Sequence, residues 1–350
     1  MSEASRAAAT APTAVETVII GAGPVGLFQI FELGLLGISA HIIDSLGQAG
    51  GQCTELYPDK PIYDIPALPI CGAQELIDRL IEQAKPFHAT FHLGEEVTEV
   101  RSMEDGKFLV GTSSGTRLKA GAVVIAGGVG SFQPRHLALP GVESFEGKNV
   151  HYRVKSAADF HGRDLLICGG GDSALDWTVA LCEKARSLTL LHRRADFRAA
   201  PATVARMREL VAAGKMQLLE GNPVALRRDA DTLLGVDVHT ADGREVPVSA
   251  EHVLAFYGLH PKLGPIAEWG MELEKKALKV DTEKFQTSVH GIFAIGDINT
   301  YPGKKKLILS GFHEAALAAF GIQHHLFPEK RQFLQYTTTS PIMQKRLGLA

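Results

Sequence analysis

The stretch from Val18 to Gly26, V-I-I-G-A-G-P-V-G, decides the expected fold of the chain. A short apolar strand runs straight into three glycines with the spacing G-x-G-x-x-G, at Gly21, Gly23 and Gly26. The first glycine permits a tight turn, the second lets the backbone approach a pyrophosphate, and the third lets the next helix pack against the strand. Asp44 ends the following strand and is placed to accept hydrogen bonds from ribose hydroxyls. We therefore expect a dinucleotide-binding unit here rather than a plain tight turn.

The same arrangement recurs further along the chain, where an apolar strand leads into G-G-G-D-S-A. In both units, 23 residues separate the first glycine from the end of the next strand, which here is His192 followed by two arginines. A cation cluster at this place favours the 2′-phosphate of NADP(H), although a solvated strand end is the alternative. The first unit should take the adenosine half of a non-phosphorylated dinucleotide. The residues expected to bind NADPH are Gly169, Gly171, Asp172, Ser173, Ala174, His192, Arg193, Arg194 and Arg198.

The composition narrows the class of protein. A chain of 350 residues can form two domains, and a net charge of −3 argues against a general nucleic-acid binder. No apolar run reaches the length of about 18 residues that a membrane span needs. The four cysteines form no C-x-x-C motif and are expected to be reduced thiols in a cytoplasmic protein. No metal site is expected, because the zinc-ligand spacing is missing.

The order of the motifs predicts one domain inserted into another. The strand that should close the first unit, Gly291–Asp297, lies far downstream of the second glycine motif. The expected fold class is therefore α/β, with two Rossmann-like, three-layer ββα dinucleotide-binding domains, the NADP domain lying within a split domain for a non-phosphorylated dinucleotide. The expected boundaries are a disordered tail at 1–14, the split dinucleotide-binding domain at 15–130 and 263–327, an NADPH-binding domain at 131–262, and a C-terminal tail at 328–350.

Five motifs in this order resemble the low-molecular-weight thioredoxin reductases, a family of two-dinucleotide flavoproteins. They are G-A-G-P-V-G, the G-G-Q at Gly50–Gln52, G-G-G-D-S-A, H-R-R and G-I-F-A-I-G-D. The resemblance implies FAD in the split domain, NADPH in the inserted domain, and a homodimer. Thioredoxin reductases carry C-x-x-C just before G-G-G-D-S-A, but the matching stretch Tyr152–Ser156 contains no cysteine. Dithiol reductase activity is therefore not expected.

Two further stretches are similar to the thioredoxin-reductase-like ferredoxin–NADP reductases, which lack that dithiol. These are L-Y-P-D-K-P-I-Y-D-I-P from Leu56 and the tail F-L-Q-Y-T-T-T-S from Phe333. The resemblance implies that Tyr57 stacks on one flavin face and that Tyr336 of the other subunit covers the opposite face. An apolar tail that seals the dimer interface is the alternative for Tyr336, and core packing is the alternative for Val97 and Phe132. The residues expected at FAD are Gly21, Gly23, Gly26, Asp44, Gly51, Gln52, Tyr57, Val97, Phe132, Asp297 and Thr338.

The function implied by this resemblance is hydride exchange between NADPH and FAD, followed by single-electron exchange with ferredoxin or flavodoxin. An NADPH-dependent flavoprotein reductase or oxidase acting on a small molecule such as a quinone is the alternative, and a flavin-binding redox sensor is a third. The lysines Lys304–Lys306 follow the Gly-Asp motif closely. They are expected in a solvated loop or, alternatively, in a docking patch for an acidic protein.

Overall fold

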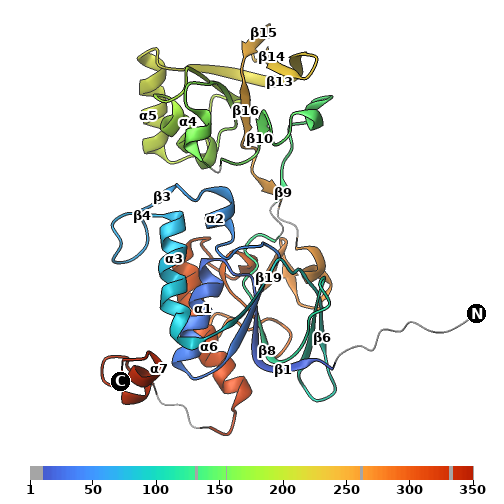
Figure 1. Ribbon diagram of the computed structural model, residues 1–350, viewed down its shortest axis with the longest axis vertical. Helices are drawn as coiled ribbons and strands as arrows, with labels where there is room; N and C mark the ends of the chain where they lie inside the picture. The colour runs from blue at the N-terminus through green and yellow to red at the C-terminus, as the bar shows by residue number, and fades with distance from the viewer. Residues whose placement is uncertain (1–10, 131–132, 155, 261–262, 331–333, 350) are drawn as a thin grey trace, which may run out of the picture. The chain divides into compact units, whose positions relative to one another are not determined.

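The computed structural model describes residues 11–130, 133–154, 156–260, 263–330 and 334–349. The chain forms two compact units (Figure 1). The first combines Met1–Ser131 with Pro261–Ala350, and the second is Phe132–His260. Phe132, one of the expected FAD contacts, lies outside the described residues.

The first unit is built on a mixed sheet with the order β5-β2-β1-β8-β7-β6, and β20 also pairs with β8. The strands β5, β2, β1, β8 and β20 are parallel, whereas β6 and β7 add an antiparallel meander. Strand β8 joins the two parts, because its first half pairs with β7 and its second half with β20. The bounds are β1 Thr13–Ile20, β2 Ala40–Asp44, β5 Thr90–Leu93, β6 Val97–Ser102, β7 Phe108–Thr112, β8 Arg117–Ile125 and β20 Ile292–Ala294.

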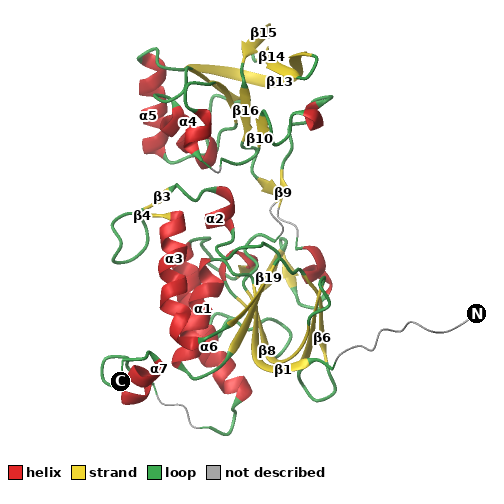
Figure 2. Cartoon of the chain, in the orientation of Figure 1, coloured by secondary structure: helices red, strands yellow, loops and turns green. Residues whose placement is uncertain are grey.

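Three helices accompany this sheet, and α1 (Pro24–Leu35) packs against both α3 (Ala73–Ala84) and α6 (Ile308–Leu326) (Figure 2). The apolar residues of α3 recur at helical spacing and face the core, which is why this segment forms an amphipathic helix. The expectation of a disordered segment through residue 14 was wrong at its end. Thr13 and Ala14 extend β1, since they pair with Leu118 and Lys119 of β8.

The short elements of the first unit lie mainly in its connections. They are α2 Gln52–Leu56, β3 Pro61–Ile62, β4 Cys71–Gly72, η1 Lys85–Phe87, η4 Gly264–Glu268, β18 Leu273–Glu274, β19 Ala277–Lys279, η5 Gly296–Ile298, β21 Asn299–Thr300 and α7 Pro341–Arg346. Of these, α2 begins at the glutamine of the G-G-Q motif and η5 contains the Gly-Asp motif.

The second unit repeats the parallel core, with the strand order β10-β16-β11-β12-β13-β14-β15. Strand β13 begins parallel to β12 and continues as the first strand of an antiparallel meander with β14 and β15. Its elements are β10 Val150–His151, η3 Ala157–Phe160, β11 Asp164–Cys168, α4 Asp172–Leu181, β12 Ser187–His192, α5 Pro201–Ala212, β13 Gln217–Asp229, β14 Thr232–Thr240, β15 Glu245–Ser249 and β16 His252–Ala255, with η2 Val142–Ser144 and the pair β9 Gln133–Pro134 and β17 Leu259–His260.

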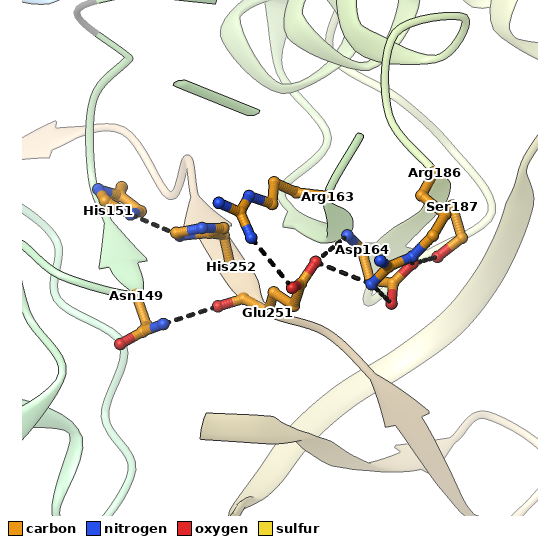
Figure 3. A network of polar contacts seen from close by, with 8 residues as sticks. All are labelled: Asn149, His151, Arg163, Asp164, Arg186, Ser187, Glu251 and His252. Carbon is orange, nitrogen blue, oxygen red and sulfur yellow. Dashed lines mark hydrogen bonds and ion pairs between the residues drawn. The ribbon is translucent and has the colours of Figure 1, made fainter. Parts of the chain in front are cut away.

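A polar network joins the strand ends of the second unit that lie away from the glycine loop (Figure 3). The Arg186 guanidinium donates to Asp164 Oδ1 at 2.9 Å and to Glu251 Oε2 at 2.9 Å. Glu251 Oε2 also accepts the Asp164 backbone N–H at 3.0 Å, and Asn149 Nδ2 donates to the Glu251 carbonyl at 2.9 Å. The Arg186 hydrogen bond is the main reason why the pKa of Asp164 lies below its usual range. The network therefore ties the N-terminal ends of β10, β11, β12 and β16 together.

A histidine pair sits beside this network. The His151 and His252 rings are joined between Nε2 and Nδ1 at 3.1 Å, so at least one of the two must be neutral (Figure 3). Burial lowers the pKa of both histidines. The neighbouring His252 lowers that of His151 further, and the Arg163 guanidinium lowers that of His252. Both rings are also packed edge-on against Phe160.

We expect this pair to make the second unit less stable as the pH falls. Because the folded-state pKa of each histidine is lowered, the unfolded chain binds more protons below about pH 6.5, and stability declines there. Thermal unfolding followed across this range should show a steeper decline for the wild type than for His252→Gln, which removes one titrating ring. His161→Gln, at an exposed histidine, should keep the wild-type slope. An unchanged slope in His252→Gln would contradict the assignment.

Candidate functional site

The three glycines of the first loop have different roles. Gly21 and Gly26 are required by close packing, whereas Gly23 faces open space. Gly21 has φ +109°, and a methyl group there would lie 2.5 Å from the Ala126 carbonyl oxygen. A methyl group at Gly26 would overlap the Gly21 carbonyl oxygen, whereas one at Gly23 would meet no atom within 4 Å. Gly23 is also the N-cap of α1 and provides no side-chain cap. The open backbone at this helix N-terminus fits a pyrophosphate, which the free N–H groups and the helix dipole would bind.

Asp44 holds the loop from the neighbouring strand. Its Oδ2 accepts the Ala22 backbone N–H at 2.6 Å, and its Oδ1 accepts the Leu46 N–H at 2.8 Å. Burial raises the pKa of Asp44, and the two backbone hydrogen bonds act in the opposite direction. Each carboxylate oxygen keeps a further acceptor site, so a ribose hydroxyl can bind without displacing either contact. The structure thus adds a loop-holding role to the ribose-binding role expected from the sequence.

The G-G-Q turn lies directly over the first glycine loop. The Gly50 N–H donates to the Ala22 carbonyl at 2.8 Å, and a methyl group at Gly51 would lie 3.1 Å from the Gly23 Cα. Gln52 begins α2, and its Nε2 would lie 3.4 Å from a methyl group at Gly128. The structure therefore brings Gly51 to the first glycine loop and the Gln52 side chain to Gly128, and their contact with a shared ligand stays a prediction.

Tyr57 and Asp297 share one polar environment. Burial is the main cause that raises the pKa of Tyr57 above its usual range, and the Cys53 thiol and the Asp297 carboxylate both contribute. Burial also raises the pKa of Asp297, which the Lys306 and Lys304 ammonium groups counteract. Asp297 lies on the turn η5 directly after β20, at the end of the parallel strands where ligands bind in open α/β sheets.

Within the described chain, no hydrogen bond to this group is seen for Val97, Tyr336 or Thr338, the other expected FAD residues. Glu95, two residues before Val97, donates its backbone N–H to the Asp44 carbonyl at 3.0 Å. Val97 is buried in the core on β6. Tyr336 is 65% exposed and Thr338 is also exposed. Beyond them, Arg346 of α7 donates to the Leu35 carbonyl at the C-terminal end of α1, the end away from the glycine loop. A flavin contact by Tyr336 or Thr338 therefore stays a prediction that requires the tail of a second copy.

The expectation of a solvated loop at Lys304–Lys306 was wrong for Lys304. Its side chain is 6% exposed and forms an ion pair with Glu314 of α6, whose side chain is 0% exposed. Lys305 and Lys306 are exposed. The sequence analysis missed Glu314. The available signal was a carboxylate between the apolar residues of H-E-A-A-L-A-A, since a charge rarely occupies a helix core without a partner.

The second glycine loop has the same division of roles. Gly169 has φ +150°, and a methyl group there would lie 2.6 Å from the Phe256 carbonyl oxygen. A methyl group at Gly171 would meet only the Arg198 carbonyl oxygen at 3.9 Å, so this backbone is accessible. A methyl group at Gly170 would overlap the His192 ring, whose Nε2 lies 3.1 Å from the Asp196 carbonyl. His192 therefore packs on the loop and supports the turn that follows.

The turn at residues 193–198 carries three arginines and is called the arginine turn. It is bound to the second glycine loop. The Arg198 N–H donates to the Gly170 carbonyl at 2.7 Å, and the Ala200 N–H donates to Asp172 Oδ1 at 2.9 Å. Arg193, Arg194 and Arg198 themselves are exposed. Asp172 therefore holds this turn against the start of α4. The cations expected to recognise a 2′-phosphate stand beside the helix N-terminus that would bind the pyrophosphate.

Other chemistries find little support in the part of the chain that the structure describes. No group of three or more His, Cys, Asp or Glu side chains there is arranged to hold a metal ion. No described helix is long and apolar enough to cross a membrane. The four cysteines are free and buried.

The fold and the two loops agree with comparisons to known proteins. Residues 58–296 match the family model described as pyridine nucleotide-disulphide oxidoreductase. The crystal structure of T. acidophilum thioredoxin reductase is similar to this chain with a TM-score of 0.76 at 22% identity, covering 88% of this chain and 97% of that one. The chain is thus a pyridine nucleotide-disulphide oxidoreductase with two dinucleotide-binding domains.

Sequence relatives narrow the class. The chain is 60% identical over 340 residues to a ferredoxin–NADP reductase 2 of Cupriavidus metallidurans, covering 97% of this chain and 92% of the relative. It is 58% identical over 342 residues to a ferredoxin–NADP reductase of Methylibium petroleiphilum, covering 97% and 93%. The chain belongs to the ferredoxin–NADP reductase family with the thioredoxin-reductase fold. The resemblance and the α/β fold class expected from the sequence are confirmed.

We expect Gly23→Ala and Gly26→Ala to have different effects on stability and on FAD binding. Gly23→Ala should leave the unfolding temperature of the FAD-free protein near the wild-type value and weaken FAD binding, because the methyl group enters only the ligand space. Gly26→Ala should lower that unfolding temperature, because the methyl group meets backbone. Calorimetry and an FAD titration measure the two effects. A destabilised FAD-free Gly23→Ala protein would contradict the division.

The arginine turn predicts that the enzyme prefers NADPH to NADH. Arg198→Ala and Asp172→Ala should each raise KM for NADPH by about tenfold or more, with a much smaller change for NADH. The first variant removes a cation, and the second releases the turn that carries it. Steady-state kinetics with both nucleotides measure the ratio. Arg206→Ala, an exposed arginine on α5, is the matched control. Equal losses with NADPH and NADH would contradict the 2′-phosphate assignment.

Proposed function

We propose that this chain is a ferredoxin–NADP reductase, which exchanges hydride between NADPH and FAD and single electrons with ferredoxin or flavodoxin. The observation that carries the proposal is the pair of glycine loops with opposite charge at the matching place. Asp44 follows the first loop, and the arginine turn follows the second. A carboxylate suits an unmodified ribose, and cations suit a 2′-phosphate.

The residues of the first unit fit FAD. Gly21, Gly23 and Gly26 shape the pyrophosphate site, and Asp44 accepts from the ribose. Asp297 accepts from the ribityl hydroxyls, while Gln52 and Tyr57 reach the ring. When bound, the flavin supplies the conversion between two-electron hydride chemistry and single-electron transfer. The NADPH residues bind and orient the nicotinamide nucleotide through its phosphates, and no side chain of the set is assigned as a general acid or base.

The cysteines support direct exit of electrons from the flavin. Burial raises the pKa of the Cys53 thiol to about 11 and that of Cys168 to about 12, which keeps both thiols protonated. In sequence, the stretch that carries C-x-x-C in thioredoxin reductases has none here. A thiolate relay to a disulfide substrate therefore lacks its nucleophile among the described residues.

Each domain is assigned one cofactor, and the flavin site is completed by a second subunit. Residues 15–130 and 263–327 bind FAD, and residues 131–262 bind NADPH. The enzyme acts as a homodimer in the cytoplasm, in which Tyr336 and Thr338 of one subunit cover the flavin of the other. The exposed Lys305 and Lys306 offer positive charge to an acidic carrier. Lys306 is close enough to Asp297 to lower its pKa, which supports a location of this charge near the proposed flavin site.

Stopped-flow spectroscopy of the FAD-loaded enzyme tests the proposal. NADPH should bleach the flavin absorbance rapidly, and oxidised ferredoxin added next should restore it while becoming reduced. Thioredoxin should leave the reduced enzyme unchanged, which controls for thiol chemistry. Reduction of thioredoxin would refute the proposal. Turnover with quinones but not with ferredoxin would favour the alternative small-molecule reductase.

A further inference from the structure

A fully buried carboxylate stands behind the Gly-Asp turn of the first unit. Glu314 lies in the second turn of α6, and its side chain is 0% exposed. Its Oε2 accepts from the Gly296 backbone N–H at 2.7 Å and from Asn299 Nδ2 at 2.8 Å. Its Oε1 accepts from the Tyr301 hydroxyl at 2.9 Å and from Lys304 Nζ. Four donors therefore satisfy a carboxylate that would otherwise be costly to bury.

Lys304 binds the other backbone polar group of Gly296. Its Nζ donates to the Gly296 carbonyl oxygen at 2.9 Å as well as to Glu314. The two partners of the ion pair therefore hold both backbone polar groups of Gly296, the residue before Asp297. The direction of the Asp297 side chain follows from the backbone orientation that these two bonds set.

The turn η5 packs between neighbouring elements that fix its position. The turn η5 follows a strand of only three residues, and Gly296 lies against Val25 of α1, because a methyl group there would meet the Val25 side chain at 3.5 Å. Val25 also fills the space over Gly311 of α6. The turn is thus placed where α1, α6 and β20 meet, and Glu314 ties it to α6.

We propose that Glu314 and Lys304 are positioning residues for FAD, which hold the backbone N–H and C=O of Gly296 in a clamp so that the Asp297 side chain meets the ribityl chain. This inference rests on the proposed function for the identity of the ligand. The pair also balances charge, because the Lys304 ammonium forms an ion pair with Glu314 and opposes the effect of burial on the pKa of Asp297. A buried ion pair is weak evidence for stability as such, so a role in orientation is the better account of its presence.

The test compares two donors to the same oxygen. Lys304→Met and Tyr301→Phe each remove one donor from Glu314 Oε1, but only Lys304 also reaches Gly296. Lys304→Met alone leaves a buried carboxylate without its cation, so the double variant Glu314→Gln/Lys304→Met, which removes both charges, is included. The control double variant, Glu272→Gln/Lys279→Met, removes an exposed pair whose atoms are 3.0 Å apart.

The readouts are FAD release from the diluted holoenzyme, measured by the fluorescence of free flavin, the visible circular dichroism of bound flavin, and the unfolding temperature. We expect both clamp variants to release FAD about tenfold more readily and to change the dichroism, with the double variant regaining unfolding temperature but not FAD affinity. Tyr301→Phe and the control pair should stay within about twofold of the wild type.

Wild-type FAD retention and dichroism in the double variant would overturn the inference. So would a loss in Tyr301→Phe equal to that in Lys304→Met, since that result would show general loosening rather than a clamp on Gly296. The outcome is separable from the proposed function. A wild-type enzyme that holds FAD but does not reduce ferredoxin would refute the function and leave the clamp intact.

Discussion

The contact between Gly26 and the Gly21 carbonyl is the constraint on which the first unit depends. A side chain at Gly26 would overlap this oxygen, so only glycine lets α1 start this close to the end of β1. The same approach places Gly23 with its face open and fixes where Asp44 and the G-G-Q turn can reach the loop. The second unit reaches the same geometry through Gly169 and Ala174, where the methyl group of alanine replaces the third glycine.

The two units differ at the end of the strand that follows each glycine loop. After the first loop, the Asp44 carboxylate accepts one hydrogen bond from the Ala22 N–H of the loop and one from the Leu46 N–H. After the second, His192 packs on the loop and the next residues form an exposed turn held by Asp172. A turn bound through its backbone leaves its arginine side chains available to a ligand. One scaffold therefore presents an acceptor in one unit and cations in the other.

The features that could be predicted from the sequence are those that a short stretch of chain determines. The glycine spacing, the apolar strands and the matched distance to Asp44 and His192 gave both loops, because each is set within about 25 residues of chain. The Glu314–Lys304 pair could not be foreseen in the same way. A lysine in K-K-K is normally solvated, and only the return of α6 brings a carboxylate to it. The flavin contacts expected of Tyr336 and Thr338 stay predictions for another reason, since the flavin that they would contact belongs to a second copy of the chain.

The buried groups of the expected FAD site divide into neutral thiols and charged side chains that are paired. Burial raises the pKa of the Cys53 thiol, so the thiol near Tyr57 stays neutral. The nearby charges are instead carried by Asp297, Glu314 and Lys304, and Lys304 offsets the two carboxylates. A site that fixes its charges through backbone contacts changes little when an electron passes, because few groups need to reorient or exchange protons. Such a site suits a flavin whose electrons leave without covalent chemistry.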